Sequence, residues 1–215
     1  MIIAIDGTAA SGKGTLAKKL AARLGLAHLD TGALYRITGQ MLHQNGISPE
    51  EITPENAAKA AENLDISLMN DPSIRTAKAG EMASLVAALP DVRVALQSFQ
   101  RNFAHTPPPS ESGQAVNGAV LDGRDIGTVI LPDADVKFFV DAALDIRANR
   151  RFDELTAAGE DTDFETVRTA LAARDDRDKN RETSPLIPAA DAVMVDTSNL
   201  DVDAMVDFAC DHLTK

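Results

Sequence analysis

The sequence has no tryptophan, one tyrosine and a single cysteine, Cys210, among its 215 residues. One cysteine cannot form an intrachain disulfide, and so few aromatic rings argue against stacking platforms for single-stranded nucleic acid. Positive charge is also scarce, because 21 Lys and Arg oppose 33 Asp and Glu, for a formal net charge of −12. A chain this acidic lacks the cationic surface that broad nucleic-acid binding needs, so a local group of arginines has to hold any anionic ligand.

Long apolar runs are missing as well. No stretch approaches the roughly 18 residues of a membrane-spanning helix, and a strand-like segment stands at the start instead of a signal peptide. We therefore expect a cytoplasmic protein without a membrane or nucleic-acid partner. The chain is 44% hydrophobic, which suffices for one substantial core, and no internal repeat or long low-complexity tract divides it. These features predict a single domain over residues 1–215, with inserted lobes.

The strongest signal is at the start of the chain, where an apolar run turns at Asp6 into a glycine-rich segment followed by an amphipathic helix. Gly7 and Gly12 let backbone N–H groups point inward, and Lys13 is placed to reach the outer phosphates of a nucleotide. Gly14 stands where a Ser or Thr usually contacts Mg²⁺, so that direct contact is not expected. The predicted phosphate loop consists of Gly7, Thr8, Ala9, Ala10, Ser11, Gly12, Lys13, Gly14 and Thr15.

Short apolar runs, each followed by an aspartate, alternate with helical patterns along the chain. The runs are residues 2–5, 27–29, 119–121, 136–140 and 192–195. This alternation predicts an α/β fold in which a five-stranded parallel sheet is covered by helices on both faces and binds ligands at the carboxyl ends of its strands. The largely helical interval of about 47–104 predicts an inserted lobe, and a short polar insertion lies at about 153–163. The proline-rich segment 107–114 predicts a surface loop.

Two groups of charged residues follow predicted strands. Asp30-Thr31-Gly32 opens a helix that carries Arg36 about one turn further on, so a hydroxyl, helix N–H groups and a guanidinium are placed to share one anion. Asp122-Gly-Arg-Asp follows the run 119–121. Asp122 is placed to orient metal-bound water, Arg124 to bind phosphate and Asp125 to contact the amino group of a base.

Two further groups lie on predicted helices. Arg174, Asp178 and Arg181 are spaced i, i+4 and i+7, which predicts one helical face with the acid between two cations. Residues 147–151 hold three arginines within about one turn, as a mobile flap that closes over polyphosphate would need. For residues 174–181 taken alone, a solvated charged surface is the ordinary interpretation.

Along nearly its whole length the chain resembles the bacterial cytidylate kinase family of nucleoside monophosphate kinases. The matching segments are the phosphate loop, D-T-G-A-L-Y-R at 30–36, D-G-R-D-I-G-T at 122–128, and the arginine-rich helix 174–181 with S-P-L at 184–186. The resemblance implies a three-layer P-loop kinase fold in which 47–104 is the acceptor-binding lobe and 153–163 a short lid. It also implies an ATP-dependent phosphotransferase that converts CMP or dCMP to CDP or dCDP.

The resemblance further implies roles for single residues. Residues 7–15 would bind the phosphates of ATP, Lys13, Arg124 and Arg174 would be catalytic, and Mg²⁺ would be held through phosphate oxygens and water. The acceptor would be bound by Thr31, Arg36, Ser84, Arg93, Asp122, Arg124, Asp125, Arg174, Asp178 and Arg181. In this set, Arg36, Arg124 and Arg181 would bind the phosphate of CMP, and Ser84, Arg93 and Asp125 would contact the cytosine edge. Arg174 and Asp178 would contact the ribose and the phosphates near the reacting centre.

The chain departs from many relatives in one respect. Those relatives carry a small β-sheet at a position where this chain has only residues 69–73, so its acceptor lobe is shorter.

The family leads us to expect a monomer. The acceptor phosphate is already ionised, so no residue is expected to act as a base. The alternatives are a kinase for UMP, AMP or shikimate, and a nucleotide-dependent switch that hydrolyses ATP slowly. A switch would not explain the second arginine group, and the sequence has no Asn-Lys-x-Asp guanine-reading segment.

Overall fold

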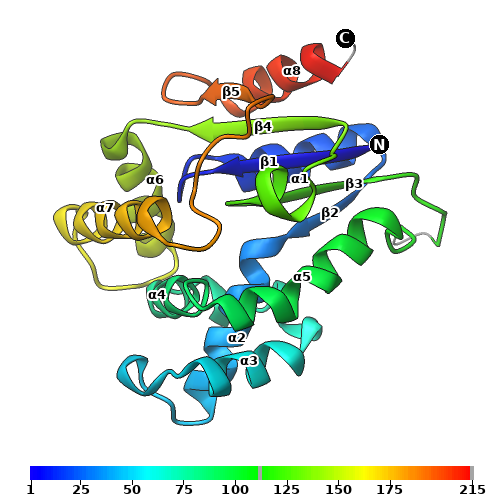
Figure 1. Ribbon diagram of the computed structural model, residues 1–215. Coiled ribbons are helices and arrows are strands. Elements are labelled where there is room, and N and C mark those ends of the chain that lie inside the picture. Colours follow the sequence, from blue (N-terminus) through cyan, green and yellow to red (C-terminus); the bar gives the residue numbers. More distant parts are fainter. Residues whose placement is uncertain (111–112, 214–215) are drawn as a thin grey trace.

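The computed structural model describes residues 1–110 and 113–213 (Figure 1). Residues 111 and 112 of the predicted proline-rich loop lie outside the described residues. The strands are β1 (Ile2–Gly7), β2 (Ala27–Asp30), β3 (Ala119–Gly123), β4 (Val136–Asp141) and β5 (Val193–Asp196). They form one parallel sheet in the order β2-β3-β1-β4-β5. The predicted α/β class and the five predicted strands are confirmed.

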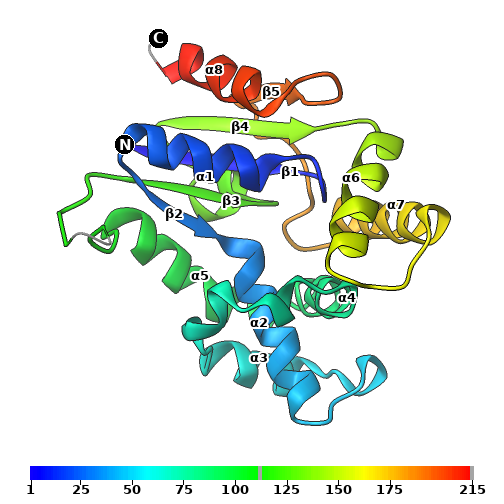
Figure 2. The same cartoon turned by 180° about the vertical axis from the view of Figure 1, so that it is seen from behind.

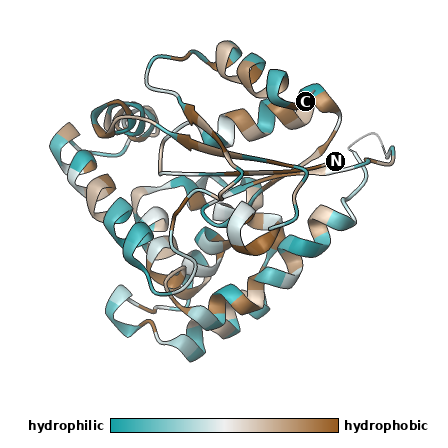
Figure 3. Ribbon diagram, turned by 45° about the horizontal axis from the view of Figure 1, so that its top comes forward, coloured by the Kyte–Doolittle hydropathy of each residue, from teal (hydrophilic) through white to brown (hydrophobic). Residues whose placement is uncertain are grey.

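Helices cover both faces of the sheet (Figures 1 and 2). α1 (Lys13–Leu24) and α8 (Val202–Leu213) pack on one face, and α5 (Pro90–His105) packs on the other. Alternate residues of β1 point to opposite faces: Ile3 and Ile5 join the core with α1 and α8, and Ala4 joins the other core. The strands are correspondingly mostly apolar before their terminal aspartates (Figure 3). No helix of the described residues has the length and apolar character needed to cross a bilayer.

Four helices form a second body with its own core beside the sheet. They are α2 (Thr31–Gln44), α3 (Pro54–Glu62), α4 (Ala77–Val86) and α5. α2 and α4 approach closely, because a Cβ added at Gly39 would lie 2.7 Å from Cβ of Met82. The shortened interval of this lobe is made of two 3-10 helices, η2 (Ile66–Asn70) and η3 (Pro72–Arg75), and another, η1 (Pro49–Glu51), precedes α3.

α6 (Leu144–Ala157) and α7 (Phe164–Asn180) pack together beyond the carboxyl ends of the strands (Figure 1). The segment between them contacts the four-helix body, because the N–H of Ala77 at the start of α4 donates to both carboxylate oxygens of Glu160, at 3.0 and 3.3 Å. Nη2 of Arg151 also donates to the carbonyl oxygen of Arg75 at 3.1 Å. α6 therefore contacts η3 through Arg151, and the polar insertion after α6 contacts α4 through Glu160.

The arginines of 147–151 differ from the predicted flap group. Arg147 is buried and donates to Asp175 at 2.6 Å and to two backbone oxygens. Arg150 donates to the hydroxyl and backbone oxygens of Thr197, at 3.0 and 2.7 Å. Two of the three guanidiniums therefore hold α6 against the body of the protein, which is contrary to a flap role for them.

Candidate active site

The phosphate loop connects β1 to α1 at the carboxyl edge of the sheet. Its backbone is left-handed at Ala10 (φ 58°) and Gly12 (φ 89°), and Gly7 has φ 152°. A Cβ added at Gly7 would lie 2.0 Å from the carbonyl oxygen of Val140, so β4 leaves room there only for glycine. Gly12 is the N-cap of α1 and supplies no side-chain cap, which leaves the first N–H groups of the helix for a ligand.

Side chains of the loop hold its shape. Oγ of Ser11 and Nζ of Lys13 both donate to the backbone oxygen of Thr8, at 3.0 and 2.9 Å. Oγ1 of Thr8 donates to Oδ1 of Asp141 at 2.6 Å. Desolvation, reinforced by the charge of Arg124, lowers the pKa of Lys13 to about 7. A lysine with this pKa gains a proton when an anion is placed beside it, which suits a phosphate-binding group.

Asp30 and Arg36 lie where β2 passes into α2. Asp30 caps α2 by accepting a hydrogen bond from the N–H of Ala33 at 3.1 Å. Its Oδ2 lies 3.5 Å from Nη1 of Arg36 and 2.8 Å from Nη1 of Arg75. Burial alone would raise the pKa of Asp30, but the two arginines outweigh burial and lower it. One carboxylate therefore orients two guanidiniums at the start of this helix.

Asp122 lies beside the phosphate loop near the end of β3, level with Asp30 on the neighbouring strand. The buried hydroxyl of Thr31 donates to the backbone oxygen of Asp122 at 2.7 Å. Oδ1 of Asp122 lies 2.8 Å from Nε2 of His28. A Cβ added at Gly14 would lie 3.6 Å from Oδ2, so the second carboxylate oxygen is near the loop.

Asp6 joins the phosphate-loop strand to the segment that follows Asp122. Its two carboxylate oxygens accept hydrogen bonds from the N–H groups of Ile126 and Gly127, at 2.7 and 2.8 Å. These N–H groups open a short π-helix, η4 (Ile126–Ile130). Burial raises the pKa of Asp6 to about 6, although both hydrogen bonds oppose the shift. The bonds fix the D-G-R-D segment relative to the loop.

Arg124, Arg174 and Asp178 form a charged group between this segment and α7. Nε of Arg124 donates to Oδ2 of Asp178 at 2.8 Å, and Nε of Arg174 lies 3.9 Å from the same oxygen. Desolvation and the charges of Arg124 and Arg36 lower the pKa of Arg174 to about 9, so the side chain stays protonated at neutral pH. Burial alone would raise the pKa of Asp178, but Arg124 and Arg174 lower it. Positive charge here exceeds what one carboxylate neutralises.

Two guanidinium nitrogens of this region, Nε of Arg174 and Nη2 of Arg181, are buried without a hydrogen-bond partner among the described residues. Buried donors in folded proteins are nearly always paired. The Arg174 nitrogen lies near Lys13 and Arg124, and the Arg181 nitrogen near Asp178. These unpaired donors therefore indicate a place for an anionic ligand with several acceptor oxygens.

Arg181 reaches this region from outside the helix. α7 ends at Asn180, and Arg181 has extended backbone angles (φ −66°, ψ 142°), so the prediction of one helical face through Arg181 is wrong. The chain turns back here, because the N–H of Leu186 donates to the backbone oxygen of Asp178 at 2.7 Å. The turn is closed by Nε of Arg181, which donates to the backbone oxygen of Ser184.

The three residues predicted to read the base are all buried. Nη2 of Arg93 donates to Oδ2 of Asp125, and the guanidinium carbon lies 5.5 Å from the ring centroid of Tyr35. Ser84 is not in that pair, because its Oγ accepts from Nε of Arg177 at 3.3 Å. The structure thus brings Arg93 and Asp125 into contact and places Ser84 against α7.

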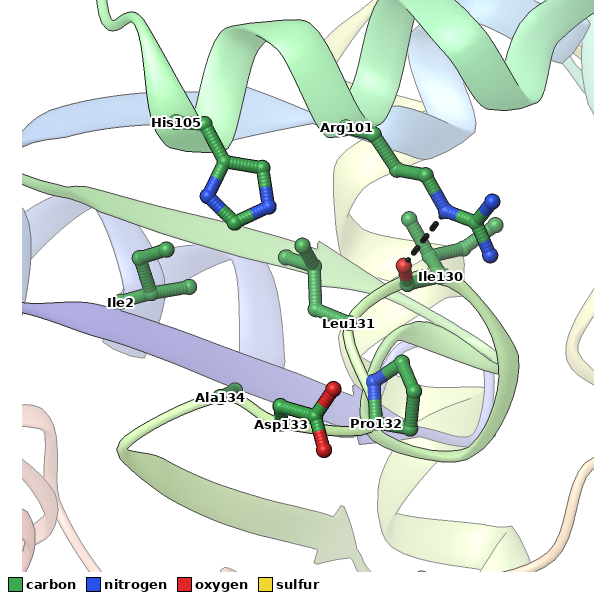
Figure 4. Close-up of a pocket in the computed structure, with 8 residues that line it drawn as sticks. All are labelled: Ile2, Arg101, His105, Ile130, Leu131, Pro132, Asp133 and Ala134. Atoms are coloured by element: carbon green, nitrogen blue, oxygen red, sulfur yellow. Dashed lines mark hydrogen bonds between the residues drawn. The ribbon is translucent and has the colours of Figure 1, made fainter.

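A separate pocket of about 190 Å³ lies between the end of α5 and the segment before β4 (Figure 4). It is lined by Ile2, at the amino end of β1, and so lies away from the carboxyl edge that carries the phosphate loop. Arg101 in its wall donates to the backbone oxygens of Ile130 and Val129, at 3.0 and 3.1 Å. Its charge therefore holds η4 in place, and none of the predicted site residues lines this pocket.

Comparison with known proteins decides among the kinase alternatives at the level of family. A family model described as cytidylate kinase matches residues 3–215. The chain belongs to the cytidylate kinase family. It is 50% identical to the cytidylate kinases of Rhodopseudomonas palustris (strain TIE-1), over 212 residues, and Bradyrhizobium sp. (strain ORS 278), over 211 residues. Both matches cover 98% of this chain and 94% of the relative.

A solved structure supports the fold independently. The crystal structure of an uncharacterized protein from Eubacterium ventriosum ATCC 27560 matches with a TM-score of 0.54 at 16% identity, covering 100% of this chain and 99% of that one. The predicted P-loop nucleoside monophosphate kinase fold is confirmed by the sheet and by membership of the cytidylate kinase family.

Sequence reasoning missed three residues that this cytidylate kinase family member places around the site: His28, Arg75 and Glu160. A polar residue inside the apolar run 27–29 was a usable signal for His28. Arg75 and Glu160 lie on a 3-10 helix and an interhelical segment. Their partners are 45 and 83 positions away, so no local pattern reveals them.

Proposed function

We propose that this protein transfers the γ-phosphoryl group of ATP to CMP or dCMP, giving CDP or dCDP. The observation that carries the proposal is the convergence of a phosphate loop and buried, incompletely paired guanidiniums on one edge of the sheet. A doubly charged acceptor phosphate next to the phosphates of ATP needs that excess of fixed positive charge. A switch that only hydrolyses ATP has no use for the second set of arginines.

On the donor side, residues 7–15 bind the phosphates of ATP. The N-terminal N–H groups of α1 face the phosphates, and Nζ of Lys13 moves from the backbone oxygen of Thr8 to the β- and γ-phosphates. Desolvation lowers the pKa of Lys13, and the negative charge of bound phosphates raises this pKa again, so the side chain takes up a proton. The resulting ammonium stabilises charge on the transferring group.

The site fits a Mg²⁺ ion that ATP brings with it. No group of three or more His, Cys, Asp or Glu in the described ranges is arranged to hold a metal ion, and Gly14 offers no hydroxyl. One carboxylate, Asp122, has an oxygen near Gly14 and suits an ion held by phosphate oxygens and water. When bound, Mg²⁺ neutralises charge on the β- and γ-phosphates.

On the acceptor side, Arg36, Arg124 and Arg181 bind the phosphate of CMP. The unpaired Nη2 of Arg181 supports this role directly. Arg174 lies between donor and acceptor phosphates, where its unpaired Nε and its charge stabilise the transition state. Asp178 orients Arg124 and contacts the ribose. Thr31 lines the site while its hydroxyl hydrogen holds the backbone of Asp122.

The base is read by hydrogen bonding along its edge. Asp125 accepts from the exocyclic amino group of cytosine, and Arg93 donates to the ring acceptors, so their ion pair opens to admit the base. Ser84 completes the edge from α4. Uracil presents an N–H and a carbonyl where cytosine presents an acceptor and an amino group, and it leaves this pair mismatched.

The reaction itself needs no enzymic base, because the acceptor phosphate is already ionised near neutral pH. Catalysis consists of placing the attacking oxygen in line with the γ-phosphorus and neutralising three equatorial oxygens.

We propose that residues 47–104 act as the acceptor-binding lobe and 153–163 as the lid. The bond between Glu160 and the N–H of Ala77 supports their closing together over the substrates. We also propose that the protein is cytoplasmic and monomeric. Size-exclusion chromatography with light scattering tests the oligomeric state.

The decisive experiment is ADP release in a coupled assay with ATP and Mg²⁺, with CMP, dCMP, UMP, AMP or no acceptor at equal concentration. Strong turnover with CMP and dCMP alone supports the reaction and the base-reading assignment together. Turnover best with UMP or AMP would overturn the roles of Ser84, Arg93 and Asp125. Slow ADP release without acceptor would favour the switch.

A further inference from the structure

His28 lies in the edge strand β2, and its ring reaches across to the neighbouring strand β3. Nε2 of His28 is 2.8 Å from Oδ1 of Asp122, although 94 positions separate the two residues. The side chain of Asp122 is 5% exposed and that of His28 is 24% exposed. The contact therefore lies inside the protein, between the sheet edge and the phosphate loop.

Asp122 is fixed at two points and open at a third. Thr31 holds its backbone oxygen and His28 holds Oδ1, while Oδ2 lies near Gly14 of the phosphate loop. Rotation of a carboxylate about its last bond is soft, with a broad two-fold preference. A partner on one oxygen therefore decides where the other oxygen points.

We propose that His28 is a positioning residue that holds the carboxylate of Asp122 so that Oδ2 receives a water molecule of the Mg²⁺·ATP complex. The inference rests on the proposed function, because it needs a metal-nucleotide complex in the phosphate loop. An ionised carboxylate only accepts, so Nε2 of His28 carries the hydrogen.

A histidine that merely fills space would behave differently from a positioning residue. Removal of a space-filling histidine would lower the stability of the fold. It would also weaken the binding of metal-free and of Mg²⁺-bound nucleotide to the same extent. Loss of a positioning residue weakens only the part of nucleotide affinity that Mg²⁺ contributes. Partners of this kind that orient groups around a metal typically contribute 10- to 100-fold in affinity or activity.

The test is calorimetric binding of a non-hydrolysable ATP analogue, with Mg²⁺ and with EDTA, in the absence of CMP. We expect His28→Leu to lose about tenfold of the Mg²⁺-dependent gain in affinity, with binding in EDTA unchanged. His28→Gln restores a donor near the position of Nε2 and should stay within about threefold of the parent protein. His43→Leu, which removes an exposed histidine of α2, is the matched control. Equal weakening of His28→Leu with and without Mg²⁺, or no weakening, would overturn the proposal.

A second pair of variants covers the case in which His28→Leu does not fold. His28→Asn is shorter than His28→Gln and does not reach Oδ1, so it should lose the Mg²⁺-dependent gain that Gln retains. Equal affinities of the Asn and Gln variants would overturn the assignment. The proposed function is checked separately with the parent protein and CMP, because a failure to phosphorylate CMP leaves the calorimetric comparison intact.

Discussion

Nε of Arg124 donates a 2.8 Å hydrogen bond to Oδ2 of Asp178, which joins the segment after β3 to α7. Both side chains are largely buried, at 16% and 7% exposure, and Arg174 approaches the same carboxylate. The bond leaves the Nη groups of Arg124 for other partners, one of which is the backbone oxygen of Gly123 at 3.3 Å. Asp178 therefore sets the direction of the Arg124 guanidinium, and its single negative charge is shared between Arg124 and Arg174.

Replacing Asp178 by Asn should lower kcat/KM for CMP by about 10- to 100-fold, because removing one member of a buried, hydrogen-bonded charge pair is costly. The KM for ATP should change less than about threefold, since the donor loop does not contact Asp178. Asp176→Asn, an exposed acid on the same helix, is the control. Steady-state kinetics with each substrate varied in turn measure both effects, and a larger loss for ATP than for CMP would contradict the assignment.

Arg181→Ala should raise the KM for CMP by about tenfold or more and leave ATP affinity nearly unchanged, because the unpaired Nη2 serves the acceptor phosphate. Lys179→Ala removes an exposed charge two residues away and serves as control. Because Arg181 also closes the turn to Ser184, thermal unfolding should accompany the kinetics. Equal losses for the two nucleotides would refute the assignment.

Binding of ATP should be coupled to proton uptake by Lys13. With a pKa of about 7 in the free protein, Lys13 is mostly neutral at pH 8, and bound phosphates raise its pKa again. Uptake should therefore approach one proton at pH 8 and vanish near pH 6, where the ammonium already exists. The buffer dependence of the binding enthalpy of a non-hydrolysable analogue measures it. The variant Lys13→Met should lose the uptake, and undiminished uptake in that variant would exclude Lys13 as its source.

Gly39→Ala and Gly80→Ala should change stability in opposite directions. A Cβ at Gly39 would lie 2.7 Å from Cβ of Met82, so α2 and α4 must separate, and the free energy of unfolding should fall by about 1–3 kcal/mol. A Cβ added at Gly80 would have Nη1 of Arg174 as its nearest atom, at 3.7 Å. Alanine at this position inside α4 should therefore raise the free energy of unfolding by about 0.5–1 kcal/mol. Chemical denaturation measures both. A Gly39→Ala protein as stable as the parent would mean that this helix contact adapts freely.

The sheet could be predicted from the sequence because buried parallel strands are short, mostly apolar and end at polar residues, and all five runs are followed by an aspartate. The phosphate loop was equally visible, since its glycines, lysine and helix are contiguous. Arg181 was misplaced because helical spacing continues past Asn180 in the sequence, while the chain itself turns back there. The pairing of Arg93 with Asp125 depends on how α5 meets the segment after β3, 32 positions away, and no pattern in the sequence encodes that contact.

The central position of β1 affects how the protein is made. β1 precedes the other four strands of the sheet in the chain, but its partner β3 begins at Ala119 and its partner β4 at Val136. Sequential strands usually neighbour one another, and contacts of long sequence separation form slowly. During synthesis, β1 therefore has no strand partner until more than half of the chain has left the ribosome. A chaperone that binds the apolar residues of β1 in this period should increase the yield of folded protein.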